Sequence, residues 1–357
     1  MPSSRRQAMW LSGLTIGVLI GMSSLTAGSG PIWKPLPPLP DPIGVAAPFA
    51  GVSGGALLVA GGANFPDRPP WQGGTKVWHD TVWVLDTPTG SWRRAGSLPA
   101  PRAYGVSITA KDRVVCLGGS DAKGPTTEVI GLRWGRGRLE SIPSSELPPP
   151  LPIPLANAAG VLDRRGVAYV ACGTPEPGER AASGRVFATV PGKRGAGWRE
   201  LPPLPAEARI LPVIAGLSEG FCLIGGAALE SRDGKTSRRY LRDAWRYAAS
   251  RGWERLPDLP RPCVAAASPA PVDGNLVFVL GGDDGSRAGQ PASASHPGFG
   301  GDLLRLDLRP PGWSHIGSLP APRVTLPCVA WRGGWVLPSG EVRPGVRSPE
   351  VWWMRLD

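Results

Sequence analysis

The sequence predicts an all-β protein, a six-bladed β-propeller, and three observations support this fold class. Three short patterns recur along the chain six times in the same order. The chain contains 50 Gly and 43 Pro, which suits many short strands joined by tight turns. Hydrophobic residues make up 41% of the chain and 15 residues are Trp, so a packed core can form. No stretch after the N-terminal segment has the periodicity of a long amphipathic helix.

The first pattern is a Trp followed by Leu-Pro pairs, and it predicts the outermost strand of each blade. Five clear copies and one degenerate copy are WKPLPPLP at 33, WRRAGSLPAPR at 92, LESIPSSELPPPLP at 139, WRELPPLPAEAR at 198, WERLPDLP at 253 and WSHIGSLPAPR at 313. The innermost strand of the next blade follows the Leu-Pro pair, as in YGVSIT at 104 and VTLPCVAW at 324.

The second and third patterns predict the two middle strands. An apolar strand ends in Gly-Gly in LLVAGG, VVCLGG, FCLIGG and VFVLGG, whereas AYVACG and WVLPSG are weaker copies. An aromatic-rich strand follows in TVWVLD, EVIGLRW, RVFATV, DAWRYA, DLLRLDL and EVWWMRL. The full set repeats every roughly 45–60 residues, which is typical of four-stranded propeller blades of the kelch type.

The chain begins and ends in the middle of a blade. The first pattern is the outer strand at Trp33, and the last is the aromatic strand at Val351. We therefore predict that the N-terminal strand completes the sixth blade beside Trp352 and Trp353, which leaves no open sheet edge. Residues 29–357 are predicted to form one propeller domain.

Residues 1–28 are predicted to be a signal peptide, with an uncleaved membrane anchor as the alternative. Arg5 and Arg6 precede an uncharged, largely apolar run, and small residues follow at Thr26–Gly30. Either alternative places the propeller in the periplasm or outside a bacterial cell. Contact with a membrane is expected only through this segment, if it is retained.

Composition favours a small ligand over nucleic acid or metal. Lys and Arg total 39 against 28 Asp and Glu, so the net charge is +11, which suits an anionic ligand or scattered surface arginines. No basic run interleaved with aromatics suggests nucleic-acid binding. Of the five cysteines, Cys116, Cys172 and Cys222 are predicted to lie inside apolar strands at equivalent points of three repeats, and no CxxC motif is present. We therefore interpret the cysteines as core residues. His79, His296 and His315 show no metal-ligand spacing, and we expect no metal site.

Strand alternation predicts where the loops meet. The loops between the second and third strands and the links between blades open on one face, where a propeller usually binds its ligand. The loops at 63–80, 228–243 and 283–302 are long, and the loop at 341–349 is short. The links carry Arg102, Arg209 and Arg323.

Two sequence blocks resemble one enzyme family. The run FAGVSGGALLVAGGANFPDRPPWQGGTKVWHDTVWVLD, followed by LPAPRAYGVSI, resembles the kelch-type sialic acid mutarotases, the N-acetylneuraminate epimerases. The family motif G-E-x-x-P-G-x-R is matched by Gly340, Glu341, Pro344, Gly345 and Arg347. In the better-known members the first block lies toward the C-terminus and the motif in an earlier blade, so this chain resembles a circularly permuted branch.

The resemblance implies an isomerase that interconverts the α and β anomers of N-acetylneuraminate or a related acidic sugar. A base takes the anomeric proton and an acid protonates the ring oxygen, which needs neither a metal nor a cofactor. Glu341 is the candidate acid/base, and Arg347 is the candidate clamp for the sugar carboxylate. Pro344-Gly345 suits a type II turn that would face these two side chains together. The alternative is an exposed loop with an ordinary surface ion pair.

Four further residues are candidate substrate contacts. Asn64 and Lys76 lie in the longest loop of the matching block, and Arg102 and Tyr104 lie in the link that follows it. Arg102 has a structural alternative, because an Arg recurs at this point in other links and could bind backbone carbonyls in each blade.

The alternative function is a non-catalytic kelch propeller that binds a glycan or a protein, since fold does not determine function. A pocket containing Glu341, Arg347 and Arg102 would favour the enzyme, and a flat face would favour the binding module. The sequence does not predict the oligomeric state.

Overall fold

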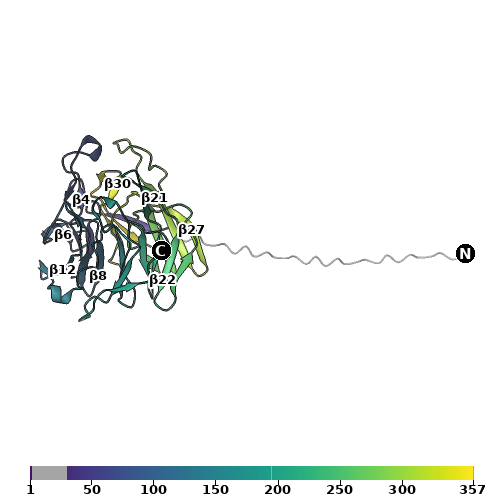
Figure 1. Cartoon of the computed structure of the whole chain (residues 1–357), viewed down its shortest axis with the longest axis horizontal. Coiled ribbons are helices and arrows are strands. Elements are labelled where there is room, and N and C mark those ends of the chain that lie inside the picture. Colours follow the sequence, from purple (N-terminus) through teal and green to yellow (C-terminus); the bar gives the residue numbers. More distant parts are fainter. Residues whose placement is uncertain (2–29, 194, 357) are drawn as a thin grey trace.

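Six four-stranded antiparallel sheets form the structure, a computed structural model that describes Met1, residues 30–193 and residues 195–356. The chain runs from the innermost to the outermost strand of each sheet, and Figure 1 follows the blades from purple to yellow. A solved propeller structure described below shares this arrangement, so the predicted fold class is confirmed. The predicted N-terminal segment 1–28 lies, apart from Met1, outside the described residues.

The strands of the first three blades are as follows. The first blade contains β2 (Phe49–Ser53), β3 (Ala56–Ala60), β6 (Thr81–Leu85) and β7 (Arg93–Ser97). The second contains β8 (Val106–Ala110), β9 (Arg113–Leu117), β12 (Val129–Gly135) and β13 (Arg138–Ser141). The third contains β14 (Ala159–Leu162), β15 (Ala168–Ala171), β16 (Val186–Thr189) and β17 (Arg199–Leu201).

The remaining blades follow the same plan. The fourth contains β18 (Val213–Gly216), β19 (Phe221–Ile224), β22 (Ala244–Ala248) and β23 (Gly252–Leu256). The fifth contains β24 (Val272–Asp273), β25 (Leu276–Gly282), β26 (Gly300–Leu308) and β27 (Pro311–Ser318). The sixth contains β28 (Val329–Trp331), β29 (Gly334–Pro338), β32 (Val351–Arg355) and β1 (Ile32–Leu36).

The N-terminal strand closes the ring as predicted. Strand β1 pairs antiparallel with β32, with Trp33 opposite Met354 and Pro35 opposite Trp352. The outer strand of the sixth blade therefore comes from the other end of the described chain. This pairing ties the first blade to the last.

Small hairpins extend the loops between the second and third strands in four blades. They are β4 (Ala63–Asn64) with β5 (Val77–Trp78), β10 (Ser120–Asp121) with β11 (Gly124–Pro125), β20 (Ala227–Arg232) with β21 (Lys235–Tyr240), and β30 (Glu341–Arg343) with β31 (Val346–Arg347). Strands β4, β21 and β30 lie on one side of the molecule, which we call the upper face (Figure 1).

Helical structure in the described residues is limited to three single turns. These are η1 (Pro70–Gln72), η2 (Ser144–Glu146) and η3 (Pro177–Glu179). Within the described part of the chain, no helix has the length and apolar character needed to cross a membrane.

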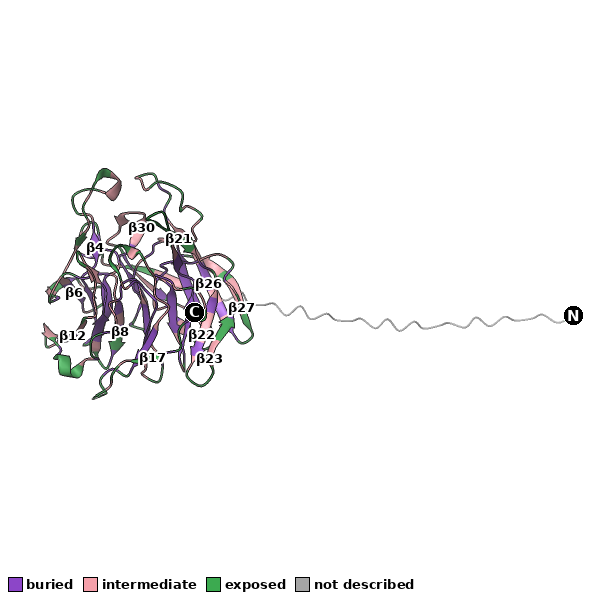
Figure 2. Cartoon of the chain, in the orientation of Figure 1, coloured by how far each residue is buried: buried purple, intermediate pink, exposed green. Residues whose placement is uncertain are grey.

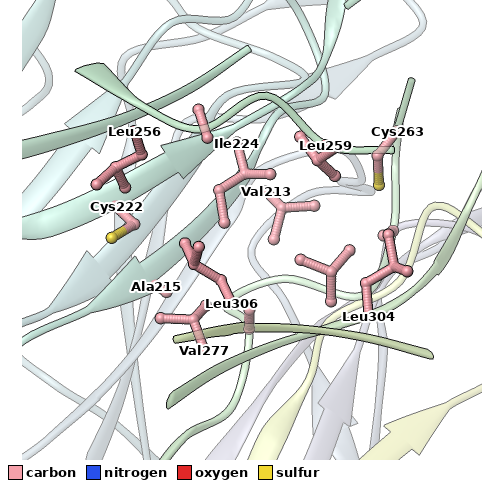
Figure 3. Close-up of a cluster of buried hydrophobic side chains, with 14 of the residues drawn as sticks. Val213, Ala215, Cys222, Ile224, Leu256, Leu259, Cys263, Val277, Leu304 and Leu306 are labelled. Atoms are coloured by element: carbon pink, nitrogen blue, oxygen red, sulfur yellow. The ribbon is translucent and has the colours of Figure 1, made fainter. Parts of the chain in front are cut away.

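The core contains six apolar layers, one between each pair of neighbouring blades, and a smaller seventh cluster that includes Ile210, Ala227 and Val264. Figure 3 shows the layer in which Cys222 and Ile224 of the fourth blade meet Val277 and Leu304 of the fifth. Side chains alternate along a strand, so Phe221 of the same strand packs toward the third blade instead. Both faces of each inner strand are thus covered, as the buried strands in Figure 2 show. This explains why these strands are continuous apolar runs.

All five cysteines are free and buried. The interpretation as core residues is confirmed, but Cys172 does not lie inside a strand. It follows β15 and takes the place of the first Gly of the Gly-Gly pair, with φ of 64°. Burial raises the pKa of the Cys172 thiol to about 12, so the thiol stays protonated at neutral pH.

The weak Gly-Gly copies keep the conformation of the strong ones. Each of the six pairs has two consecutive residues with positive φ; Ser339 and Gly340 have 58° and 106°, compared with 66° and 96° for Gly61 and Gly62. The second position is Gly throughout, because a Cβ on Gly62 would lie 2.7 Å from the side chain of Val45. The sixth repeat therefore differs from the others in its side chains at this position and has the same backbone conformation.

The six links between blades form a closed ring of backbone hydrogen bonds around the centre. One residue of each link donates its N–H to the equivalent residue of the neighbouring link, at 2.7–3.0 Å. These residues are Ala47, Tyr104, Asn157, Leu211, Ala265 and Thr325, and all six have positive φ. The ring fixes the floor on which the loops of the upper face rest.

Candidate functional site

The hairpin β30–β31 brings Glu341 and Arg347 together. The two residues are direct partners in the antiparallel register, and Arg343 pairs with Val346. Pro344 and Gly345 therefore form a two-residue turn, in which Gly345 has the φ of 80° that a type II turn requires at this position. The predicted turn and the predicted approach of the two side chains are confirmed.

The Glu341–Arg347 pair is largely buried. Arg347 Nη2 lies 3.5 Å from Glu341 Oε2, and the side chains are 5% and 17% exposed. The N–H of Gly345 donates to Glu341 Oε1 at 2.8 Å, and the Arg347 guanidinium lies 4.8 Å from the centre of the Phe65 ring. The alternative of an exposed surface ion pair is wrong.

Glu341 lines a cavity of about 290 Å³ on the upper face, which we call the Glu341 cavity. Leu211, Ala265 and Thr325 of the central ring form part of its lining. Its polar lining is drawn from the fourth, fifth and sixth blades: Arg238, Tyr240, Asp283, Arg287, Gln290, His296 and Glu341.

Two arginines place cationic groups in this cavity, beside the carboxylates of Asp283 and Glu341. Arg238 Nη2 donates to Glu179 Oε2 at 2.5 Å, and Arg287 Nη1 donates to the carbonyl of Gly298 at 2.8 Å. Burial works against the charge on Arg238, but Glu179, Tyr240 and Glu341 outweigh it and raise the pKa of the guanidinium. The cavity thus presents fixed cations beside the Glu341 carboxylate.

Tyr240 supplies a protonated phenol. Its hydroxyl donates to Asp283 Oδ2 at 3.0 Å. Burial, followed by the charge and hydrogen bond of Asp283, raises the pKa of Tyr240 to about 12. The phenol is therefore a stable hydrogen-bonding group at neutral pH, not a base.

Arg347 does not line the Glu341 cavity. Its guanidinium contacts the Phe65 ring and Glu341 Oε2. The geometry fits a residue that holds Glu341 in place. Arg347 Nε and Nη1 are buried without a hydrogen-bond partner among the described residues, and the clamp on a sugar carboxylate stays a prediction.

Arg102 belongs to a structural set of ion pairs. It is buried and bonds Glu128, the residue before the third strand of the second blade. Arg209 bonds Asp243 in the same way, with two hydrogen bonds of 2.7 and 2.8 Å. Arg323 bonds Glu350 at 2.6 Å. Arg102 lines neither upper-face cavity, and its pairing with Glu128 fits the structural alternative. Its Nε and Nη1 are buried without a hydrogen-bond partner among the described residues, and its contact with substrate stays a prediction.

Asn64 is also structural. It is 1% exposed, and its Nδ2 donates to the carbonyl of Gly44 at 2.9 Å and to Asp41 Oδ2 at 3.3 Å. Its Oδ1 lies 2.7 Å from His79 Nε2. The amide is thus engaged at both ends by the protein, and Asn64 lines neither upper-face cavity, so its contact with substrate stays a prediction.

Lys76 and Tyr104 lie in a second upper-face cavity of about 380 Å³, which we call the Lys76 cavity. The Lys76 ammonium is 5.0 Å from the ring centre of Tyr104 and 5.5 Å from that of Trp78. Glu179 separates the two cavities: it lines the Lys76 cavity, accepts a hydrogen bond from Asn157, and binds Arg238 of the Glu341 cavity. The predicted site residues are thus divided between two cavities.

The sequence prediction missed the arginines, tyrosine and histidine of the Glu341 cavity. Its only signal for them was the length of the loops at 228–243 and 283–302 and the basic character of the first. Among the described residues, no group of three or more Cys, His, Asp or Glu side chains is arranged to hold a metal ion.

Comparison with known proteins places the sequence similarity in the first two blades. Residues 23–140 match the family model of N-acetylneuraminate epimerase. The N-acetylneuraminate epimerase of Yersinia enterocolitica is 43% identical over 108 residues, which cover 27% of this chain and 26% of the relative. That of Salmonella arizonae is 38% identical over 117 residues, covering 29% and 30%. The match thus spans less than a third of these relatives, and the Glu341 motif lies outside it.

A solved structure shares the fold over nearly the whole chain. The structure titled "Structure of YjhT" aligns with a TM-score of 0.65 at 13% sequence identity, covering 90% of this chain and 97% of that one. At this identity the likeness bears on the fold alone. The predicted resemblance to the N-acetylneuraminate epimerase family is therefore confirmed for residues 23–140, within a propeller that continues to the end of the described chain.

Proposed function

We propose that this protein is an exported mutarotase that interconverts the anomers of N-acetylneuraminate or a related acidic sugar. The proposal is supported by the epimerase relatives of residues 23–140 and by the chemistry of the Glu341 cavity. Export rests on the predicted segment 1–28, and the circular permutation remains a prediction.

One observation carries the proposal: a partly buried carboxylate shares a cavity with two guanidinium groups and an apolar floor. Arg238 and Arg287 can bind the carboxylate of an acidic sugar through charge-assisted hydrogen bonds. Leu211 and Ala265 can contact an apolar substituent such as an acetamido methyl group. Glu341 then lies beside the bound ring.

The proposed reaction requires the protein to transfer one proton between two oxygens of the sugar. Glu341 takes the proton of the anomeric hydroxyl while the bond from the anomeric carbon to the ring oxygen breaks, and it returns that proton to the ring oxygen. Both oxygens are attached to one carbon, so a single carboxylate can serve both. Rotation about the adjacent bond and the reverse steps give the other anomer, with no net change in protons or electrons.

A non-catalytic sugar-binding propeller is the alternative function. The observation that favours this alternative is the Lys76 cavity, which is a second concave surface on the upper face. This alternative predicts that acidic sugars bind without faster anomer exchange. Exchange measurements therefore separate the two functions.

The decisive experiment is NMR exchange spectroscopy on free N-acetylneuraminate with the wild-type protein and with Glu341→Gln. We expect the wild type to accelerate exchange between the anomers and Glu341→Gln to lose roughly 100-fold or more of the rate, the size of effect typical of a general acid–base residue.

Glu254→Gln is the matched control, because Glu254 pairs with Arg246 in the outer strand β23, outside the cavity. Its rate should equal that of the wild type. Full activity in Glu341→Gln would remove Glu341 from the mechanism. An inactive wild type that still binds the sugar would support the binding module.

A further inference from the structure

His296 combines burial with an open ring nitrogen in the Glu341 cavity. The residue is 6% exposed and is part of the cavity lining. Its Nδ1 accepts the N–H of Gly298 at 3.0 Å. Its Nε2 has no hydrogen-bond partner within the described residues. This atom is also not fully buried, because it is absent from the set of buried polar atoms without a partner. The Nε2 edge of the ring is therefore the part available to the cavity.

Gly298 connects His296 to the other groups of the cavity. Its N–H binds His296, and its carbonyl accepts the hydrogen bond of Arg287. Gly298 has φ of 83°, and a Cβ at this position would lie 2.5 Å from the carbonyl oxygen of Val342, next to Glu341. One glycine thus fixes the imidazole and a guanidinium against the hairpin that carries the carboxylate.

The hydrogen bond from Gly298 determines the form of the imidazole. Because Nδ1 accepts an N–H, the ring proton of the neutral imidazole must be on Nε2. A ring held in this way is a hydrogen-bond donor toward the cavity. Nε2 then has no free lone pair, so on the cavity side the ring can donate a hydrogen bond but cannot accept a proton.

We propose that His296 is a further catalytic residue of the proposed mutarotase: its Nε2–H donates a hydrogen bond to the sugar oxygen that becomes negatively charged as the ring opens. This inference rests on the proposed function. A preorganised donor stabilises charge that develops in the transition state without moving a proton itself. In the step, the carbon–oxygen bond breaks, its electron pair stays on the ring oxygen, and Glu341 alone carries the proton.

The test compares His296→Ala, which removes the donor, with His296→Gln, which keeps a side-chain N–H donor. We expect His296→Ala to lower kcat for anomer exchange roughly 100-fold, the effect of losing one such donor. His296→Gln should recover most of that loss. His315→Ala is the control, since His315 is 56% exposed on the outer strand β27, and it should leave kcat unchanged.

A second measurement does not depend on activity. Nitrogen-15 NMR of the wild type with labelled histidine should show His296 as the neutral tautomer protonated on Nε2, assigned by the loss of its signals in His296→Gln. Protonation on Nδ1 would overturn the proposal even if His296→Ala failed to fold.

The outcomes separate this role from the function itself. If His296→Ala exchanges sugar as fast as the wild type while Glu341→Gln is inactive, the role of His296 is wrong and the mutarotase function stands. If both His296 variants lose activity equally, the donor role is also wrong. An inactive wild type would overturn the function and this role with it.

Discussion

At the scale of single residues, two arginines determine which ligands the Glu341 cavity can accept. Arg238 is held by Glu179, and Arg287 is held by Gly298, so neither side chain has to be ordered when a ligand binds. A preorganised guanidinium loses little entropy on binding a carboxylate. In the proposed function, these two residues would bind the carboxylate of the sugar.

We expect Arg238→Gln to weaken the binding of acidic sugar. A hydrogen bond to a charged group contributes about 1.5–3 kcal/mol, so KM should rise roughly tenfold or more. The turnover number should change less, because the proton still passes through Glu341. Exchange rates measured by NMR over a range of sugar concentrations give both parameters.

Arg239→Gln is the natural control for this change. Arg239 is the next residue of β21, but it bonds Glu207 and Glu230 and does not line the cavity. Its KM should match the wild type. If Arg238→Gln also left KM unchanged, the cation that binds the sugar would have to be sought elsewhere.

The residue scale also explains why two candidate contact residues do not line the cavities. Asn64 and Arg102 have residue types that suit substrate contact, and both lie on loops of the upper face. Each is instead buried and already hydrogen-bonded, Asn64 to Gly44 and Arg102 to Glu128. Arg102 binds Glu128 through Nη2, whereas its Nε and Nη1 have no partner among the described residues. Residue type and loop position do not reveal which polar groups are already bound within the protein.

At the scale of elements, the hairpin β30–β31 and the single turn η1 act together. A Cβ on Gly345 would lie 2.4 Å from Pro70 Cγ and 3.4 Å from Trp71, so the hairpin tip packs closely on η1. Gly345 also donates its backbone N–H to Glu341. The loop of the first blade that carries η1 therefore helps to fix the position of the Glu341 carboxylate in the sixth blade.

We predict that Gly345→Ala lowers the exchange rate at least tenfold. The new methyl group must displace either η1 or the hairpin tip, and the positive φ adds roughly 1–2 kcal/mol of strain. Both effects move the carboxylate, and a small misplacement of a reacting group greatly reduces its efficiency. The measurement is again anomer exchange, with circular dichroism to confirm folding.

Gly234→Ala tests whether strain alone explains the result. Gly234 lies in the turn of the β20–β21 hairpin with φ of 73°, and no atom lies within 4 Å of a Cβ built there. This variant should carry the strain and keep its activity. Equal losses in the two variants would mean that hairpin strain, and not contact with η1, is responsible.

At the scale of the whole molecule, the ring is closed by one strand and by a circle of backbone hydrogen bonds. Strand β1 supplies the outer edge of the sixth blade, and Trp33 packs against the layer between the fifth and sixth blades. Closure leaves each blade with two neighbours. Each upper-face cavity is lined by three consecutive blades, the first to third for the Lys76 cavity and the fourth to sixth for the Glu341 cavity.

We expect Trp33→Ala to lower the free energy of unfolding by about 1–3 kcal/mol, less than the 3–5 kcal/mol typical of a fully buried Trp, because Trp33 is only half-buried. Urea unfolding followed by Trp fluorescence and by circular dichroism measures this change. Both probes should report a single transition at a lower urea midpoint. We expect one transition because opening the sixth blade breaks the closed ring on which all blades depend.

Lys34→Ala provides the comparison within the same strand. Lys34 is exposed on the opposite face of β1 and should leave the midpoint nearly unchanged. An early, separate transition in Trp33→Ala would contradict the view that strand closure and the ring unfold together.

The sequence by itself determined the features that depend on neighbours along the chain. The Trp, Gly-Gly and aromatic patterns gave the strand order, six blades and the closing strand, because strand periodicity and turn residues act locally. The approach of Glu341 to Arg347 was also predictable, since one Pro-Gly turn decides it. Only the tertiary structure decided which side chains share a cavity. Arg238, Arg287 and His296 come from two other blades, and their direction is set by packing between loops that no local pattern encodes. For the same reason the structure alone separated Lys76 and Tyr104 from Glu341.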